Sequence, residues 1–551
     1  MSLFSRHSYE VPEETERVAR AIFPKGNLYM QWRDTFGMLF ADEDFRALYA
    51  TDGQPGLSPV RLSLVLILQF MEGLSDRQVA EAVRTRIDWK YLLGLELTDQ
   101  GFHYSVLSEF RDRLLSGEME QALFERVLDH LKAHQLLKVR GRQRTDSTQV
   151  LSAVRSLNRL ELVVETMRYA LNALAVAVPE WTYAHSQPEW VERYGERASD
   201  YRLPKSEAER IAYANLVGAD GLTLMQAVWD DHAMAWLREL PALQTLWQVW
   251  LQNYTWAEDG ELRWRSSKEI PPAAIAIRSP YDLEAHFGKK RGGSWFGYKV
   301  HLTETCDPDL PRLITHVETT SAQVQDISAT APIHGALEAK DCLPAIHIVD
   351  SGYVDAQQLV ASPRDYGIDL LGPTRPDTGW QAREGNGFTS RDFIIDWENH
   401  CAICPAGKTS LHWLPAFNGH GTPLIQIKFS KRDCRLCEFQ PHCTRSTPPR
   451  RTIGVYPETE HKALSAARER ETTEAFAQLY ALRAGVEGTI SQATRAFGVR
   501  RTRYIGLAKT HLQHVLAAIA MNMVRTLRWL TGEPLAQTRH SPFIQLHLPA
   551  A

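Results

Sequence analysis

The chain has 551 residues, 44% of them hydrophobic, and its formal charge of −4 shows no overall basic excess of the kind that marks many nucleic-acid-binding proteins. A chain of this length is expected to fold as several domains, each able to bury a core. The N-terminus has no charged segment followed by an apolar run, and the longest apolar run, residues 62–71, is far shorter than the roughly 18 residues that a membrane span needs. We therefore expect a soluble, cytoplasmic protein that does not interact with membranes.

Residues 1–135 carry a helical pattern with a tight turn near its middle. An apolar helix over 61–72 ends at a glycine, and Ser75 begins a second helix through a capping box with the glutamine three residues later. Helix, short turn and helix, with Arg77 and Arg84 exposed on the second, predict a helix-turn-helix that contacts DNA. A helical hairpin within a bundle would give the same pattern.

Two aspartates occupy positions that need a reason. Asp146 lies in the strand-like segment 136–154, where propensity disfavours aspartate, so it either binds a ligand or caps a turn with the Ser-Thr pair that follows. Asp350 follows a buried strand over 346–349 and precedes a glycine turn and a helix, which is where α/β folds place ligand-binding groups. The alternative is that Asp350 or Asp355 only caps that helix.

Between and after these aspartates the pattern changes twice. Residues 155–270 read as helical, and we interpret the tryptophans in this stretch as core anchors and not as base-stacking platforms; they are Trp181, Trp190, Trp229, Trp236, Trp247 and Trp250. Residues 271–373 then follow a strand period. The expected elements there are strands over 295–307, 312–322 and 367–373 and a helix over 333–339.

Residues 374–465 interrupt the α/β order with a segment rich in Pro, Gly and Thr that holds five of the seven cysteines. Two CxxC pairs about thirty residues apart predict a four-thiolate site for structural zinc, although an iron–sulfur cluster takes four cysteines as well. A site filled by four thiolates has no open position for catalysis. The predicted ligands are Cys401, Cys404, Cys434 and Cys437, with Cys443 as a further candidate.

Residues 466–535 place Tyr480, Arg483 and Glu487 at the i, i+3 and i+7 positions of one helix face. No other acidic residue occurs between Glu487 and Glu533, whereas arginines are frequent there. Taken alone, Glu487 would be an ordinary surface glutamate. The remaining residues, 536–551, form a short tail.

Without the segments 155–270 and 374–465, the predicted elements follow the order of a ribonuclease H-like α/β core. The first and fourth strands of that core are neighbours, so Asp146 and Asp350 would lie close together, with Glu487 approaching from a flanking helix. Three clustered carboxylates without a compensating His or Lys need a divalent cation, and hard oxygen ligands suit Mg²⁺ or Mn²⁺. Two such ions about 3.5–4 Å apart would activate a water or a 3′-hydroxyl for phosphoryl displacement.

The chain resembles the bacterial DDE transposases, and most closely those of the 1182 family of insertion sequences, over nearly its full length. The resemblance is carried by the following runs: PGLSPVRLSLVLILQFMEGLSDRQVAEAVRTRIDW, RTDST, SPYDLEAHFGKK, WFGYKVHLTETCD, HIVDSGYVDA, CPAGKTS with the CxxC pairs, and RAGVEGTISQATRAFGVRRTRYIGLAKTHLQH. It implies a Mg²⁺-dependent transposase that binds terminal inverted repeats, cleaves at the ends and joins 3′-hydroxyls to target DNA. It also implies a homodimer or higher oligomer on double-stranded DNA, associated with the nucleoid.

The resemblance assigns roles to individual residues. Asp146, Asp350 and Glu487 match the three catalytic, metal-binding acids, and Tyr480 and Arg483 match residues that contact the transposon-end backbone in related enzymes. The lysine that completes their signature is replaced here by Thr494, next to Arg495. The expected DNA contacts are Tyr480, Arg483, Arg495, Arg500, Arg501, Arg503, Lys509, Arg77 and Arg84, and Trp380 or Trp397 could stack on a flipped base.

Two other interpretations stay open. One is a nuclease on the same core that cuts DNA without joining it. The other is a decayed or domesticated protein that only binds DNA.

Overall fold

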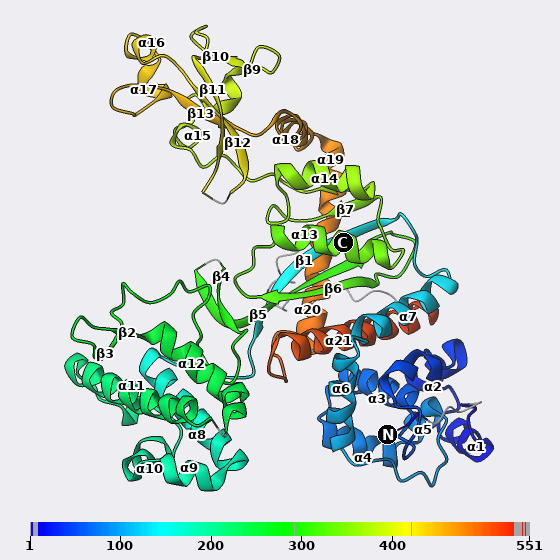
Figure 1. Cartoon of the computed structure of the whole chain (residues 1–551). Helices are drawn as coiled ribbons and strands as arrows, with labels where there is room; N and C mark the ends of the chain where they lie inside the picture. The colour runs from blue at the N-terminus through cyan, green and yellow to red at the C-terminus, as the bar shows by residue number, and fades with distance from the viewer. Residues whose placement is uncertain are drawn as a thin grey trace.

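The computed structural model describes residues 2–3, 9–232, 234–290, 292–419, 421–533, 543 and 546. The predicted tail over 536–551 lies outside the described residues except for Phe543 and Leu546. Figure 1 shows a central sheet with a blue group of helices on one side, a cyan-to-green helical group on another and a yellow β-rich part beyond the sheet. No helix in the described part of the chain is both long and apolar enough to cross a bilayer.

The N-terminal part is helical, as predicted, and α3 is its central element. The side chain of Ser58 accepts the N–H of Arg61 at the start of α3, and Gly73 ends the helix in the left-handed region at φ 69°. Ser75 begins α4 with the predicted capping box. The helices are α1 (Glu13–Ile22), α2 (Leu28–Phe36), α3 (Pro59–Glu72), α4 (Asp76–Thr85), α5 (Ile87–Leu93), α6 (Ser105–Ser116) and α7 (Glu120–Ala133).

The second helical group builds a core of its own. It consists of α8 (Arg159–Ala177), α9 (Pro179–His185), α10 (Pro188–Tyr194), α11 (Glu207–Asp230) and α12 (Pro241–Asn253), followed by the short strands β2 (Tyr254–Trp256) and β3 (Leu262–Trp264). The tryptophans that are buried in this core, as expected, are Trp181, Trp190 and Trp250. The expectation is wrong for Trp236 and Trp247, which are 49% and 43% exposed. Trp247 instead stacks on Trp229 with ring centroids 5.7 Å apart.

The central sheet has the strand order β4-β5-β1-β7-β8, and β6 pairs with β5 beyond the residues of β5 that pair with β4. Its strands are β1 (Arg142–Leu151), β4 (His286–Lys290), β5 (Gly293–Thr305), β6 (Ile314–Ser321), β7 (Ile346–Ile348) and β8 (Asp369–Leu371). β1 runs antiparallel to β5 and parallel to β7, so the predicted contact between the first and fourth core strands is confirmed. This mixed sheet with flanking helices fits a ribonuclease H-like core. Strand β4 was not predicted.

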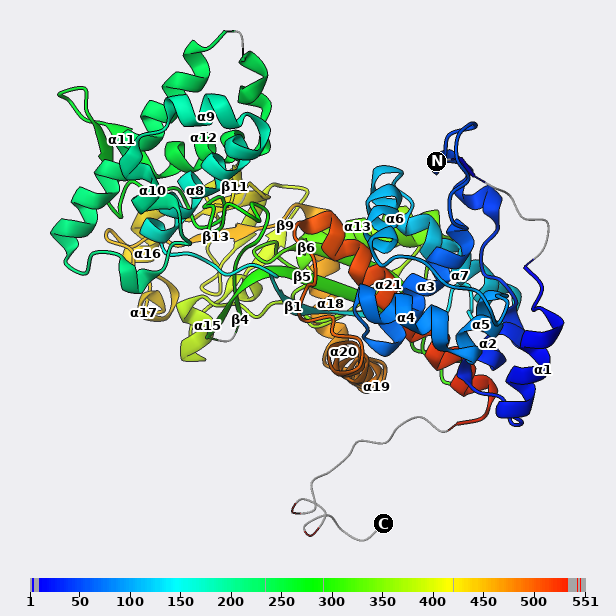
Figure 2. The same ribbon diagram turned by 90° about the horizontal axis from the view of Figure 1, so that it is seen from below.

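Four helices flank the sheet, and the last of them joins it to the N-terminal part. They are α13 (Ile327–Ala339), α14 (Ala356–Tyr366), α20 (Gly485–Arg495) and α21 (Leu507–Leu530). α21 is buried along most of its length and packs on β6, α3 and α7. Figure 2 shows it lying between the sheet and the blue helices. The sheet and the N-terminal helices therefore share one hydrophobic core.

The β-rich part has only a small core, built around Phe393, Ile427, Phe429 and Ile453. Its elements are α15 (Trp380–Glu384), β9 (Ile394–Asp396), β10 (Cys401–Ile403), β11 (His412–Phe417), β12 (Pro423–Lys428), α16 (Lys431–Arg435), α17 (Gln440–Cys443) and β13 (Thr452–Val455). Helix α18 (Glu458–Arg470) then packs against α14 and leads back to the sheet.

The helix expected to carry Tyr480, Arg483 and Glu487 is interrupted. α19 (Glu474–Ala481) ends in a 3-10 turn at Leu482–Ala484, and α20 begins at Gly485. The interruption coincides with a long-range contact, since Arg144 of β1 donates a hydrogen bond to the carbonyl of Leu482. A Cβ at Gly485 would lie 2.2 Å from the Arg144 guanidinium, so any other residue at the start of α20 would have to displace that side chain. The prediction that one regular helix carries Tyr480, Arg483 and Glu487 at the i, i+3 and i+7 positions is therefore wrong, because a 3-10 turn lies between Tyr480 and Glu487.

Candidate active site

The three predicted catalytic acids line one cavity of about 520 Å³. Asp146 comes from the middle of β1, Asp350 from the turn after β7, and Glu487 from the first turn of α20. The parallel pairing of β1 with β7 brings the two aspartates together, and α20 packs on β1 to add the glutamate. Residues more than three hundred positions apart in the sequence thus form one polar site.

Neither aspartate serves the simple local role that was the alternative for it. Asp146 lies within β1, paired opposite Leu302, and does not cap a turn. The cap of α14 is Asp355, whose carboxylate accepts the N–H of Gln358 at 2.8 Å. Asp350 accepts the N–H of Gly352 in its own loop, at 2.7 Å, and it lines the cavity.

A guanidinium lies between the two aspartates. Arg483 Nη2 donates to Asp146 Oδ2 at 2.7 Å and is 3.7 Å from Asp350 Oδ2. Burial raises the pKa of the Asp146 carboxyl, while the charge of Arg483 and the N–H of Ser147 oppose this rise. Lys290, at the end of β4, also lines the cavity. The expectation that the carboxylates have no compensating His or Lys is therefore wrong, because Lys290 lines the same cavity.

The donor chemistry of the site fits a divalent cation. Carboxylate oxygens are hard ligands, and Asp146 and Asp350 already share one positive group, the Arg483 guanidinium. Among the residues that the structure describes, no three His, Cys, Asp or Glu side chains converge closely enough to hold an ion as they stand. A cation could join these carboxylates only if Arg483 moved away from them.

A buried ion cluster behind the cavity fixes the strands and helices that carry the acids. Glu304 of β5 is fully buried and pairs with Arg144 at 2.7 Å and with Arg525 of α21 at 2.9 Å. It also accepts a hydrogen bond from the hydroxyl of Thr489. Arg144 stands two residues before Asp146, and Thr489 two residues after Glu487. Glu304 therefore ties β1 to α20 immediately beside two of the acids.

Some predicted DNA contacts lie at this cavity. Arg483, Arg495 and Arg500 line it, and Arg500 Nε donates to Thr148 Oγ1 at 2.8 Å. Thr494, at the place of the family's lysine, lines it too, with its hydroxyl bonded to the carbonyl of Ile490 at 2.6 Å. Tyr480 stacks on Phe476 in a small cluster beneath β7 and β8.

The other predicted DNA contacts lie away from the acids. Arg503 donates to the carbonyls of Gly73 and Leu74, in the turn between α3 and α4. Lys509 pairs with Asp112 of α6 at 2.7 Å. Arg84 pairs with Glu81, Arg77 lies over the ring of Tyr104, and the backbone of Arg501 bridges to Leu151.

Sequence reasoning missed Lys290, Arg144 and Glu304. Lys290 ends the FGKK run, where two adjacent lysines before a strand were the available signal. Arg144 and Glu304 gave no comparable signal, because each lies in a strand that carries several other polar residues. Nothing in the sequence showed that the two strands would pair them opposite each other.

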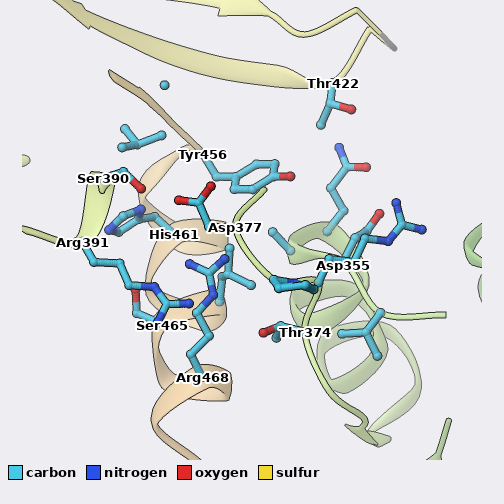
Figure 3. A pocket seen from close by; sticks show the side chains of 18 of the residues that line it. Asp355, Thr374, Asp377, Ser390, Arg391, Thr422, Tyr456, His461, Ser465 and Arg468 are labelled. Carbon is cyan, nitrogen blue, oxygen red and sulfur yellow. The ribbon is translucent and has the colours of Figure 1, made fainter. Parts of the chain in front are cut away.

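A larger cavity, of about 910 Å³, lies between α14, α18 and the β-rich part, and none of the three acids lines it. Figure 3 shows Arg391, His461 and Arg468 on one side of it and Asp355 on the other. Neither predicted stacking residue lines either cavity. Arg445 covers the ring of Trp380, and Trp397 packs against Trp413 and His461.

The predicted zinc ligands are gathered only in part. A cavity of about 450 Å³ in the β-rich part is lined by Cys404, Cys434, Cys437 and Cys443. Cys401 does not line this cavity and lies in β10, paired opposite Asp396. Cys306 and Cys342 are buried elsewhere.

Two separate parts of the chain match known protein families. Residues 17–113 match the model of a transposase domain (DUF772), and residues 403–527 match that of a transposase DDE domain. No curated protein matches the chain. The first match covers most of the N-terminal helices, and the second covers Glu487 and most of the cysteines. Residues 17–113 and 403–527 are thus similar to transposase domains, and Asp146 and Asp350 lie outside both matched ranges.

Proposed function

We propose that this protein is the transposase of an insertion sequence of the 1182 family. A transposase DDE domain implies a nuclease or transferase that acts on DNA. The proposed reaction is cleavage at the terminal inverted repeats, followed by joining of the freed 3′-hydroxyls to target DNA. The observation that carries this proposal is the convergence of Asp146, Asp350 and Glu487 in one cavity edged by Arg483, Arg495, Arg500 and Lys290.

The three acids would hold two Mg²⁺ or Mn²⁺ ions, which when bound supply an activated water or 3′-hydroxyl and stabilise the leaving oxygen. The chain's own contribution is to hold these carboxylates in register. β1 and β7 fix Asp146 and Asp350, while Glu304 fixes α20 against β1. Arg495, Arg500 and Lys290 offer positive charge for the phosphates of the DNA end.

The proposed transposase function also assigns a role to each part of the chain. The helices over 1–135 would bind the transposon ends through α3 and α4, and segments 155–270 and 374–465 are inserts in the catalytic core of 136–154, 271–373 and 466–535. Work on two DNA ends calls for at least a dimer. Arg503 lies in the segment between α20 and α21 and donates hydrogen bonds to carbonyls in the turn between α3 and α4. This contact links the proposed DNA-binding helices directly to the catalytic core.

Arg483 has two roles in this proposal. Without DNA and cations its guanidinium neutralises Asp146 and Asp350, and in the loaded complex it is released to bind a phosphate. Arg483→Gln is therefore expected to tighten Mn²⁺ binding to the DNA-free protein roughly tenfold, which corresponds to about 1.4 kcal/mol. Titration of Mn²⁺ followed by electron paramagnetic resonance of the free ion measures this affinity.

The matched control is Arg495→Gln, which removes a charge from the same cavity without removing an ion pair to the acids. We expect its effect on Mn²⁺ affinity to be clearly smaller. Equal or weaker Mn²⁺ binding in Arg483→Gln would rule out the competing role of the guanidinium.

A strand-transfer assay tests the proposed function against both alternatives. Purified protein, Mg²⁺, a pre-cut duplex of the element's end and a supercoiled target plasmid are combined without ligase. The proposal predicts end–plasmid joints. Cutting without joints would favour the nuclease, and binding without cutting would favour the decayed protein.

A further inference from the structure

The cavity of the β-rich part collects four thiols from three places in the chain. Cys404 follows β10, Cys434 lies in α16, Cys437 follows that helix, and Cys443 ends α17. Cys404, Cys434 and Cys443 pack against the small core of this part. Cys401 belongs to a CxxC pair with Cys404, but it lies at the start of β10 and does not line the cavity.

Backbone N–H groups point at two of these sulfur atoms. The N–H of Lys408 donates to Cys404 Sγ and the N–H of Arg451 donates to Cys434 Sγ, each at 3.4 Å. The first bond is made by a tight turn in which Gly407 adopts φ +73°. Hydrogen bonds of this kind orient and stabilise thiolates that ligate metal ions.

Cationic side chains lie beside the thiols. Four thiolates around a divalent ion carry a net charge of −2; Arg451 and Lys408 line the same cavity, together with the carboxylates of Asp433 and Glu438. Arg451 is anchored there by a hydrogen bond from Nη1 to the carbonyl of Cys443 at 2.9 Å. The small core of this part gives a further reason for a metal, because small folds commonly need one to be stable.

We propose that Cys404, Cys434, Cys437 and Cys443 bind one structural Zn²⁺ in a tetrahedral site, and that Cys401 is not a ligand. The sulfur atoms do not yet converge on one point among the described residues, so ion binding draws α16 and α17 toward the Cys404 turn. Each thiol that ligates the ion releases its proton to solvent. The site is remote from the acids, and the proposal does not depend on the catalytic one.

The two cysteines that distinguish this ligand set from the CxxC-pair set are Cys443 and Cys401, and they form a matched pair of variants. Full-length wild type, Cys401→Ser and Cys443→Ser are purified, and zinc, iron and acid-labile sulfide are measured. We expect one zinc per chain in wild type and in Cys401→Ser, and loss of most of it in Cys443→Ser. Zinc lost from Cys401→Ser but kept in Cys443→Ser would overturn the proposal, as would iron with sulfide or no metal in wild type.

Thiol labelling of the wild-type protein gives a second measurement that needs no variant to fold. The protein is alkylated before and after treatment with a zinc chelator, and the modified positions are mapped by mass spectrometry. We expect Cys401 to react before chelation and the other four cysteines of this part only after it. Protection of Cys401 together with early labelling of Cys443 would contradict the proposed ligand set.

Discussion

Asp350→Asn is expected to lower the rate of cleavage at the element's ends by roughly 10³-fold or more, with DNA affinity little changed. The carboxamide has nearly the same shape but no charge, so it cannot help Asp146 and Glu487 to hold a divalent cation. The Asp350 carboxylate accepts the N–H of Gly352, and the oxygen of a carboxamide can accept the same bond, so the fold should tolerate the change. Single-turnover cleavage of a labelled end duplex, with binding followed by fluorescence anisotropy, measures both quantities.

Asp355→Asn is the matched control, five residues away. Asp355 caps α14, and asparagine caps a helix about as well as aspartate. Its cleavage rate should stay close to that of wild type. An Asp350→Asn protein that cleaved at the wild-type rate would show that Asp350 is not part of the catalytic site.

Glu304→Gln is expected to destabilise the protein by about 3–5 kcal/mol, which is the usual effect of removing one partner from a buried ion cluster. The side chain of Arg144 is only 3% exposed, so its charge would stay buried without a carboxylate. Urea unfolding followed by tryptophan fluorescence measures the loss in free energy of unfolding. Cleavage activity at each urea concentration separates the unfolding of the catalytic core from that of the other parts.

The control for this change is Glu81→Gln, which breaks an exposed pair with Arg84. Exposed pairs contribute little, so its unfolding midpoint should match that of wild type. A Glu304→Gln protein as stable as wild type would mean that the cluster does not hold β1, β5 and α20 together.

The order of the core strands other than β4 could be predicted because each of them has a short-range signal. Alternating polar and apolar residues predicted β5 and β6. Asp350 follows a buried strand, and in a ribonuclease H-like core that strand pairs with the strand of Asp146. The parallel pairing of β1 with β7 bears this out. Asp146 and Asp350 lie close together because β1 and β7 pair in this register.

The 3-10 turn before Glu487 could not be predicted, because its cause is a long-range contact. Tyr480 to Glu487 has good helical spacing, and only the bond from Arg144 to the Leu482 carbonyl, across the sheet, shows why the helix breaks. The ion pair of Arg483 with Asp146 was hidden for the same reason.

The cysteine site shows a different limit of sequence reasoning. Two CxxC pairs predict that both cysteines of each pair bind the metal. In the structure Cys401 begins β10 and does not line the cavity that Cys404 lines. Spacing alone does not reveal which thiol of a pair faces inward. The exposed Trp236 and Trp247 make a similar point, since residue type predicts burial only on average.

The central claim is that Asp350 is a direct ligand of a catalytic cation, and a change of metal preference tests it most directly. In Asp350→Cys a thiolate replaces a carboxylate, and Mn²⁺ accepts sulfur more readily than Mg²⁺ does. Cleavage of the labelled end duplex is measured in each metal. We predict no detectable cleavage in Mg²⁺ and partial recovery in Mn²⁺; cleavage at the wild-type rate in Mg²⁺ would contradict the claim.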